Sequence, residues 1–334
     1  MRILIATGVY PPQAGGPSFY AKSLKDEFEK LGHSVTVRTF TVERYLPTGI
    51  RHLFYLCKTL PAFFKAEYVL VFDTFSVGFP VALLQKLFHR KVTLRIGGDF
   101  LWEEYVERTK EKILLSEFYE KKRTFTFKEK CILYATRFAL QSATYIVFNT
   151  DYQKDIWVKA YGIATDNIFI IENRMEPARD VVPASNKTFV YAAARDLVWK
   201  NADSARQAFI EVQKAIPDAR FEFLFDLSRE EAIKKIEAAY VCILVSLSDV
   251  SPNYILRALS FGKPVILATE NGLRSRLGDA AMYVDPFDIH AIADGIIRMS
   301  DTAVYEAYVR KVRMLSYDHT YADIAREFLA ICQK

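Results

Sequence analysis

The stretch Ser248-Asp-Val-Ser-Pro-Asn-Tyr-Ile-Leu-Arg-Ala-Leu-Ser-Phe-Gly-Lys-Pro-Val-Ile266 carries start and stop signals for a short helix between two apolar runs. Ser251 is predicted to be the N-cap, with Pro252 at the first helical position, where its missing N–H costs nothing. Gly262 is predicted to end the helix. The apolar runs are typical of buried strands. In such a strand–helix–strand unit the helix N–H groups open at the carboxyl ends of the strands, which suits a phosphate-bearing ligand.

Length and composition set broad limits on the protein class. The 334 residues are enough for two ordinary domains. A net charge of +5 is compatible with an anionic substrate or an acidic membrane surface, but it is too weak to indicate nucleic acid binding. The four cysteines lack metal-type spacing, so we expect them to be reduced and the protein to be cytoplasmic.

No segment is predicted to cross a membrane or to act as a signal peptide. The opening apolar run after Met1-Arg2 is too short for a signal sequence. The longest weakly polar stretch, 68–84, is interrupted by Asp73, Gly78 and Pro80, and it falls short of the roughly 20 apolar residues that a spanning helix needs.

Strand and helix patterns alternate along the whole chain, which predicts an α/β fold with mainly parallel sheets and helices on both faces. Expected strands are 2–7, 34–40, 68–72, 91–96, 144–148, 168–171, 188–193, 220–225, 241–245, 264–267 and 281–284. The polar, proline-bracketed segment 175–183 is the best candidate for a linker. We therefore expect two Rossmann-like domains facing each other across a cleft, at 1–178 and 184–316, and a C-terminal helix at 317–334 that packs back on the first domain.

Two further features follow predicted strands. The Gly15-Gly16-Pro17 turn comes between the first strand and its helix, where glycines let backbone N–H groups approach a ligand. Arg195 and Lys200 follow the strand at 188–193, and two cations at this edge could hold a diphosphate. The alternatives are a tight turn that needs glycine for its angles and an ordinary pair of surface charges.

These three features share the carboxyl ends of predicted strands, where open α/β sheets place their ligands. Their coincidence favours one binding site over three independent accidents. No Asp-x-Asp triplet or His/Asp cluster is available to hold a metal, so we expect no metal site.

The chain resembles glycosyltransferase family 4, whose members are retaining, nucleotide-sugar-dependent enzymes with the GT-B fold. The resemblance covers nearly the whole chain. It rests on the loop 11–16, the Gly97-Gly98-Asp99 turn followed by Trp102-Glu103, Asn173, the R-x4-K spacing of Arg195 and Lys200, and Ser251-Pro252-Asn253 followed by Ala258 and Gly262-Lys-Pro-Val-Ile. It implies that Gly15, Gly16, Arg195, Lys200 and the helix opening at Ser251, Pro252 and Asn253 bind the donor's diphosphate.

Two departures from the family pattern stand out. Where the family has E-x7-E, this chain has Asp249 and Arg257. Arg257 has only donors and cannot accept from ribose hydroxyls, so it either adds a phosphate contact or marks an inactive site. The second domain is also shortened, since the chain passes almost directly from Phe225 to a predicted helix at 228–239. The base pocket is then abbreviated, and the donor is either UDP- or GDP-linked.

The resemblance implies sugar transfer with retention at the anomeric carbon, with no cofactor besides the donor. Arg195 and Lys200 are expected to stabilise the leaving group, and Asp249 to orient the donor sugar. Asp99 and Glu103 are candidates for the acceptor side; the alternatives are a capping Asp and a solvated helix Glu.

The acceptor is expected to be a glycan or a lipid-linked molecule. The stretch 44–65 interleaves basic residues with aromatic and aliphatic ones, and Lys121-Lys122-Arg123 precedes Phe125 and Phe127. This composition is typical of an amphipathic helix that lies on the inner face of an anionic membrane. The alternative is that the aromatic residues belong to the core and the lysines between them are solvated. Two other functions stay open: a catalytically silent homologue that binds a nucleotide or glycan or acts as a scaffold, and a GT-B epimerase or hydrolase.

Overall fold

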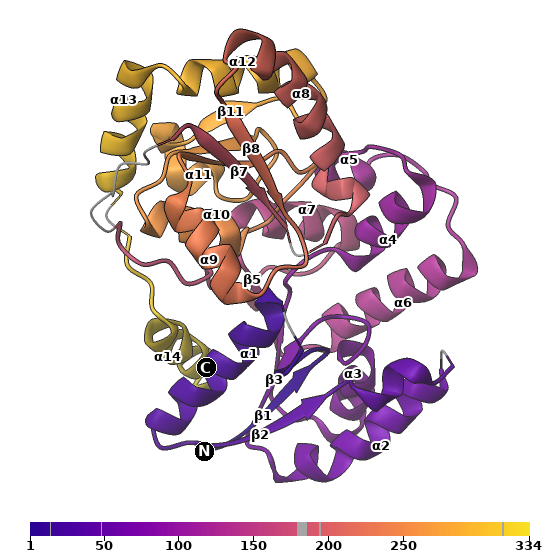
Figure 1. Ribbon diagram of the computed structural model, residues 1–334. Helices are drawn as coiled ribbons and strands as arrows, with labels where there is room; N and C mark the ends of the chain where they lie inside the picture. Colours follow the sequence, from indigo (N-terminus) through magenta and orange to yellow (C-terminus); the bar gives the residue numbers. More distant parts are fainter. Residues whose placement is uncertain (14, 48, 179–185, 194, 316) are drawn as a thin grey trace. The chain divides into compact units, whose positions relative to one another are not determined.

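The computed structural model describes residues 1–13, 15–47, 49–178, 186–193, 195–315 and 317–334. The chain forms two compact units (Figure 1). Unit 1 comprises Met1–Leu101, Lys122–Glu172 and Thr320–Lys334, and unit 2 comprises Trp102–Lys121 and Asn173–His319. Strands and helices alternate in both, as the sequence predicts.

Unit 1 is built on a parallel sheet in the order β2-β1-β3-β4-β5-β6. The strands are β1 (Arg2–Thr7), β2 (Ser34–Thr39), β3 (Tyr68–Phe72), β4 (Val92–Arg95), β5 (Tyr145–Phe148) and β6 (Ile168–Ile170). The helices are α1 (Gly16–Lys30), α2 (Ile50–Lys65), α3 (Gly78–Phe88), α6 (Phe127–Ser142), α7 (Asp151–Tyr161) and α14 (Tyr321–Cys332), with the 3-10 turn η1 (Val42–Tyr45). Every residue of β3 is buried, because helices cover both faces of the sheet.

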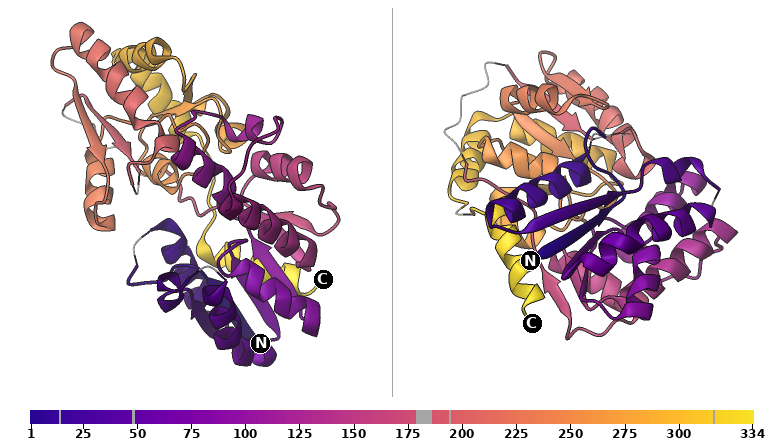
Figure 2. Two further views of the ribbon diagram at one scale, coloured as in Figure 1. Left: turned by 90° about the vertical axis from the view of Figure 1, so that its right-hand side faces the viewer. Right: turned by 90° about the horizontal axis from the view of Figure 1, so that it is seen from below.

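Helix α14 packs against α1 within unit 1 (Figure 2). Its start is set by Thr320, whose hydroxyl and the Asp323 carboxylate form a capping box. Ile324 and Phe328 are fully buried in the same apolar cluster as Phe28 of α1. The predicted C-terminal segment 317–334 therefore contains a helix, at Tyr321–Cys332, with its apolar stripe inward.

Unit 2 is built on a second parallel sheet, in the order β11-β10-β9-β7-β8. Its strands are β7 (Thr188–Ala192), β8 (Arg220–Leu224), β9 (Val241–Leu244), β10 (Val265–Ala268) and β11 (Met282–Val284). Its helices are α4 (Phe100–Thr109), α5 (Leu115–Phe118), α8 (Ala202–Ala215), α9 (Arg229–Ala238), α10 (Asn253–Ser260), α11 (Arg274–Leu277), α12 (Ile289–Met299) and α13 (Thr302–Arg313), with the 3-10 turns η2 (Val198–Lys200) and η3 (Gly278–Ala280).

Both sheets follow the same topology. Counted within each unit, the strand order is 2-1-3-4-5, with a sixth strand added in unit 1. This is a doubly wound, Rossmann-like arrangement, so the predicted α/β fold with two parallel sheets is confirmed. In such sheets a ligand binds where the strand order reverses, outside the carboxyl ends of the strands. The reversal lies between β1 and β3 in unit 1, and between β7 and β9 in unit 2.

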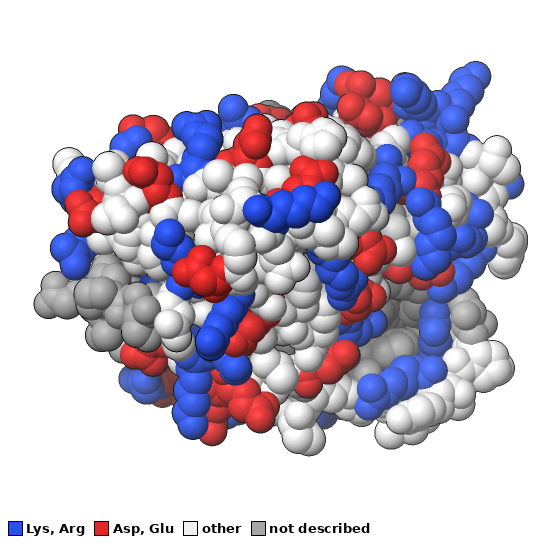
Figure 3. Space-filling view, turned by 45° about the horizontal axis from the view of Figure 1, so that its top comes forward, with Lys and Arg blue, Asp and Glu red and all other residues white. Residues whose placement is uncertain are grey.

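The candidate linker 175–183 is described only up to residue 178, so 179–183 lies outside the described residues. Its first residue is ordered within unit 2, because Met175 exchanges two backbone hydrogen bonds with His319, at 3.1 and 3.0 Å. On the face drawn in Figure 3, basic and acidic side chains are interspersed. Among the described residues, no helix is long and apolar enough to span a bilayer.

Candidate functional site

The reversal point of unit 2 collects several of the residues that the sequence singles out. Arg195 and Lys200 lie on the loop after β7, and Asp249 and Ser251 lie on the loop after β9. These two strands are hydrogen-bonded neighbours in the sheet. The loops therefore leave the same sheet edge side by side, where parallel sheets of this topology bind ligands.

Lys200 and Asp249 form the central contact between these loops. The Lys200 ammonium donates to Asp249 Oδ2 at 2.6 Å, and each side chain is only 15% exposed. The ammonium also lies 4.1 Å from the centroid of the Trp199 ring. Charge-assisted hydrogen bonds of this kind are about twice as strong as neutral ones. The predicted leaving-group cation and the predicted sugar-orienting carboxylate are thus held together.

Asn201 fixes the backbone that presents Lys200. It is 2% exposed and adopts a left-handed conformation, φ 59°, which asparagine tolerates better than most residues. Its side-chain amide donates to Val245 O at 3.0 Å and to Pro286 O at 2.7 Å, and its Oδ1 accepts from Lys112 Nζ at 2.9 Å. Our sequence analysis missed this residue, although an asparagine directly before a helix is a recognisable capping signal.

The Asp249 backbone is held equally firmly. Its carbonyl accepts from the Gly272 N–H at 2.8 Å, and residue 249 pairs with Asn271 as an isolated parallel bridge. Leu247, two residues earlier, donates its N–H to Trp199 O at 2.9 Å and ties the two loops together. Both ends of the Lys200–Asp249 ion pair therefore have a rigid support.

Helix α10 begins one residue later than predicted. Its first residue is Asn253, and its N-cap is Pro252, which makes no side-chain cap hydrogen bond. The prediction that Ser251 caps the helix and that Pro252 opens it was wrong, because Pro252 is extended with ψ 109°. Ser251 instead uses its carbonyl to accept from Asn173 Nδ2, at 3.0 Å. Since no side chain caps it, the start of α10 keeps the partial positive charge of a helix N-terminus.

Arg257 lies one turn into α10 and faces a carboxylate. Its NH1 atom is 3.7 Å from Glu176 Oε2, and Glu176 also forms an ion pair with Arg174. The segment that leads into the candidate linker and the start of the linker itself therefore both contact α10 or the loop just before it, through the Asn173 amide and the Glu176 carboxylate. Glu176 is a second residue that our sequence analysis missed.

Arg195 is exposed on the loop after β7. Its neighbour Asp196 forms an ion pair with Arg206 at 2.7 Å. No ion pair involves Arg195 within the part of the chain that the structure describes. Its role in holding an anion stays a prediction.

Most of the remaining predicted residues lie in unit 1, and one lies in unit 2. Gly15, with φ 126°, is the N-cap of α1, and Gly16 is the first helical residue. Few residues other than glycine adopt that angle, so the turn needs Gly15 for its backbone. Asp99, just before α4, is 2% exposed, whereas Glu103 lies in unit 2. The structure thus joins Lys200, Asp249 and the start of α10 in one unit, while Gly15, Gly16 and Asp99 belong to the other.

Asp73 occupies the reversal point of unit 1 and was not singled out by our sequence analysis. It directly follows β3 and has φ 144°, a conformation that costs a non-glycine residue about 1–3 kcal/mol. Its Oδ1 accepts from the N–H groups of Phe75 at 2.9 Å and Val77 at 3.1 Å. Burial raises the pKa of Asp73 to about 6, against the opposing effect of these hydrogen bonds. An acidic residue directly after the buried run 68–72 was the available signal.

The described residues contain no group of three or more His, Cys, Asp or Glu side chains placed to hold a metal ion. The four cysteines are all free thiols.

No family model and no curated protein matches the chain. Solved structures do, over nearly their full length. HepE of Anabaena, solved with UDP-glucose, is 14% identical with a TM-score of 0.71, and the match covers 100% of this chain and 99% of that one. WaaG, a glycosyltransferase involved in lipopolysaccharide biosynthesis, is 13% identical with a TM-score of 0.70 and 99% coverage of both chains. Sucrose-phosphate synthase from Thermosynechococcus elongatus is 14% identical, with a TM-score of 0.68 and coverage of 99% and 96%. The chain therefore has the GT-B fold, with two Rossmann-like domains.

Proposed function

We propose that the chain is a retaining glycosyltransferase that moves a sugar from a nucleoside diphosphate donor to a glycan or lipid-linked acceptor without a metal ion. The observation that carries the proposal is the Lys200–Asp249 pair, 2.6 Å apart at the reversal point of the second sheet. The GT-B fold and the UDP-glucose complex of HepE are consistent with it.

The chemical task in such a transfer is to stabilise negative charge on the departing diphosphate. Lys200 supplies a fixed cation, and the uncapped start of α10 supplies backbone N–H groups and a helix dipole. Arg195, exposed on the same loop as Lys200, adds a second cation. A bound diphosphate would share the Lys200 ammonium with Asp249, and the Asp249 carboxylate could then accept from hydroxyls of the donor sugar.

The ribose of the donor needs an acceptor group for its two hydroxyls. Arg257 cannot accept a hydrogen bond, but the Glu176 carboxylate beside it can. Arg257 lies four residues after the first residue of α10, which is roughly 6 Å along a helix. This offset matches the step from a diphosphate to its ribose, so we assign ribose recognition to Glu176, with Arg257 as its positioning partner.

A thermal-shift panel with UDP, GDP and their glucose and mannose conjugates tests donor binding. We expect one nucleotide to raise the melting temperature of the parent protein and to bind Arg195→Ala at least several-fold more weakly. Lys214→Ala, an exposed lysine on α8, is the matched control and should bind as the parent does. Equal binding by Arg195→Ala would remove that residue from the site, and no response to any nucleotide would overturn the proposal.

The lipid side of the proposal rests on one face of α2. Ile50, Leu53, Phe54 and Phe64 are all between 44% and 63% exposed. The neighbouring turn η1 adds Tyr45, at 80%. Basic residues lie at the ends of the same helix, so this face combines apolar side chains with positive charge. Such a surface fits the headgroup region of an anionic bilayer, and we propose a peripheral contact there.

Co-sedimentation with vesicles tests this contact. Leu53→Ser/Phe54→Ser should lose binding to vesicles that contain phosphatidylglycerol, because both side chains insert in the proposal. Tyr134→Ser, which removes a 67% exposed aromatic residue of α6, is the control and should keep binding. If the parent protein stays in the supernatant with anionic vesicles, the membrane contact is excluded.

A catalytically silent homologue is the second candidate, favoured by one observation. Asp249, the expected sugar-orienting group, is already neutralised by Lys200. A protein that binds the nucleotide but forms no product from its preferred donor, with or without acceptor glycans, would be such a homologue. Release of free sugar or a changed sugar without acceptor would indicate a hydrolase or an epimerase.

A further inference from the structure

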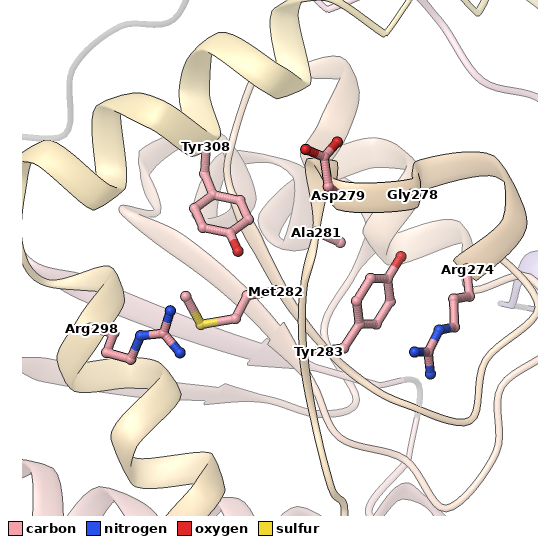
Figure 4. Close-up of a pocket in the computed structure, with 8 residues that line it drawn as sticks. All are labelled: Arg274, Gly278, Asp279, Ala281, Met282, Tyr283, Arg298 and Tyr308. Atoms are coloured by element: carbon pink, nitrogen blue, oxygen red, sulfur yellow. The ribbon is translucent and has the colours of Figure 1, made fainter.

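A second pocket lies along the edge strand of unit 2. It has a volume of about 480 Å³ and is lined by residues from α11, η3, β11, α12 and α13 (Figure 4). Pockets that bind small molecules commonly measure 300–1,000 Å³. Strand β10 separates β11 from β9, so the pocket is roughly 10 Å along the sheet from the β7/β9 reversal point. Its lining includes the first residues of β11, at the amino end of the strand, and none of the donor-site residues.

The pocket carries a positive charge. Arg298 of α12 and Arg274 of α11 lie on opposite sides of it, with Tyr308, Met282 and Tyr283 between them (Figure 4). Among the described lining residues the acidic group is Asp279, and Lys311 neutralises it, with its ammonium 2.9 Å from Asp279 Oδ2. No hydrogen bond or ion pair engages the Arg298 side chain within the described residues.

Arg274 is preorganised, whereas Arg298 is available. The NH1 group of Arg274 donates to Thr269 O at 3.2 Å, and its guanidinium lies 5.0 Å from the Tyr283 ring. This guanidinium is fixed in place and keeps further N–H donors. Arg298 is exposed at the last turn of α12 and can turn its planar fork toward an anion.

The floor of the pocket is aromatic and apolar. Tyr308 contributes its ring and hydroxyl, Tyr283 lies against the Arg274 guanidinium with its hydroxyl buried, and Met282 is 5% exposed. Burial raises the pKa of Tyr283 to about 12, so it is a neutral phenol at physiological pH. Aromatic faces pack on the C–H faces of sugar rings, and phenol hydroxyls exchange hydrogen bonds with sugar hydroxyls.

We infer that this pocket is a second binding site, separate from the donor site, for a sugar unit that bears an anionic group. Arg298 pairs with the carboxylate or phosphate, Arg274 adds positive charge from the opposite side of the pocket, and Tyr308 packs against the ring. The preference for an anion rests on the two guanidinium groups alone, whereas the saccharide character rests on the proposed function. In a glycosyltransferase, such a site would hold part of an acidic acceptor or product chain away from the reacting end.

Isothermal titration with glucuronate, glucose 6-phosphate and glucose tests the inference. The parent protein should bind one or both anionic sugars and bind glucose at least tenfold more weakly. Glucuronate and glucose 6-phosphate separate a carboxylate from a phosphate as the preferred group. Arg298→Ala should weaken anionic sugar binding at least tenfold. Tyr308→Ala should also weaken anionic sugar binding, and its glucose binding should be no tighter than that of the parent protein.

Two controls separate this site from the donor site. Arg310→Ala, an exposed arginine of the same helix as Tyr308, should bind the anionic sugars as the parent does. UDP or GDP binding should be unchanged in Arg298→Ala, which also reports that the variant is folded. The inference is overturned if no anionic sugar binds at millimolar concentration, if glucose binds as tightly, or if Lys200→Met removes the sugar binding that Arg298→Ala leaves intact. Failure of nucleotide binding with intact sugar binding would overturn the proposed function alone.

Discussion

Replacing Lys200 with methionine should destabilise the protein and weaken nucleotide binding by separate, measurable amounts. The substitution keeps the length of the side chain but leaves the Asp249 carboxylate, 15% exposed, without its 2.6 Å donor. A hydrogen bond to a charged group contributes about 1.5–3 kcal/mol. A loss of about 2 kcal/mol lowers the melting temperature of a domain of 150–250 residues by roughly 4–8 °C. Calorimetry of Lys200→Met without ligand measures this loss.

Lys200→Met also removes the hydrogen bond that Lys200 is proposed to donate to the bound diphosphate. A loss of about the same free energy predicts roughly 10- to 100-fold weaker binding of UDP or GDP. Asp249→Asn is the informative partner variant. It should bind the nucleotide at least as tightly as the parent does, because Lys200 no longer shares its charge, while sugar transfer is lost. The double variant should be more stable than the sum of the two single losses implies, since each single change leaves a charge unpaired.

Two results would refute this reasoning. If Lys200→Met binds UDP and GDP as tightly as the parent, the cation does not face the diphosphate. If Asp249→Asn weakens nucleotide binding as much as Lys200→Met does, the pair supports the loops and takes no direct part in ligand binding.

Three further predictions concern stability. Asp73 has a pKa of about 6 in the folded state against 3.8 in the unfolded state. Its contribution to the free energy of unfolding is therefore largest below pH 4, and it falls by about 3 kcal/mol as the pH rises from 4 through 6. Urea unfolding should therefore show that Asp73→Asn loses less stability between pH 4 and 7 than the parent does. Asn201→Ala should cost about 2–4 kcal/mol by orphaning buried partners, and Asn201→Gly less, by the same measurement. Gly78→Ala places a Cβ in steric clash with the Asp73 carbonyl oxygen and should lower the melting temperature.

The secondary structure was largely predictable because its signals are local. The expected strands agree with the observed ones within about one residue at each end, since buried parallel strands are continuous apolar runs. Helix starts with strong caps were also readable: Ser228 of α9 and Thr320 of α14 form capping boxes. The start of α10 was predicted wrongly. Ser251 and Pro252 are residue types that commonly begin a helix, but here Pro252 is extended and precedes the first helical residue.

The candidate site was only partly predictable because its contacts are distant in sequence. Lys200 and Asp249 were each singled out, but their ion pair depends on β7 and β9 being neighbours, which the sequence alone does not establish. Glu176 was missed because its partner, Arg257, follows 81 residues later. Asp73 was overlooked because an acidic residue after an apolar run also reads as an ordinary turn.

The placement of α14 has a consequence for how the protein is made. Its buried side chains Ile324 and Phe328 complete a cluster that also contains Phe28, yet the ribosome adds them only after all of unit 2 has been synthesised. Part of the apolar surface of unit 1 therefore stays uncovered until residues 320–334 have been synthesised and α14 can pack against it. During translation the later-made unit can finish folding first, so nascent chains stalled before residue 320 should be the form that chaperones recognise.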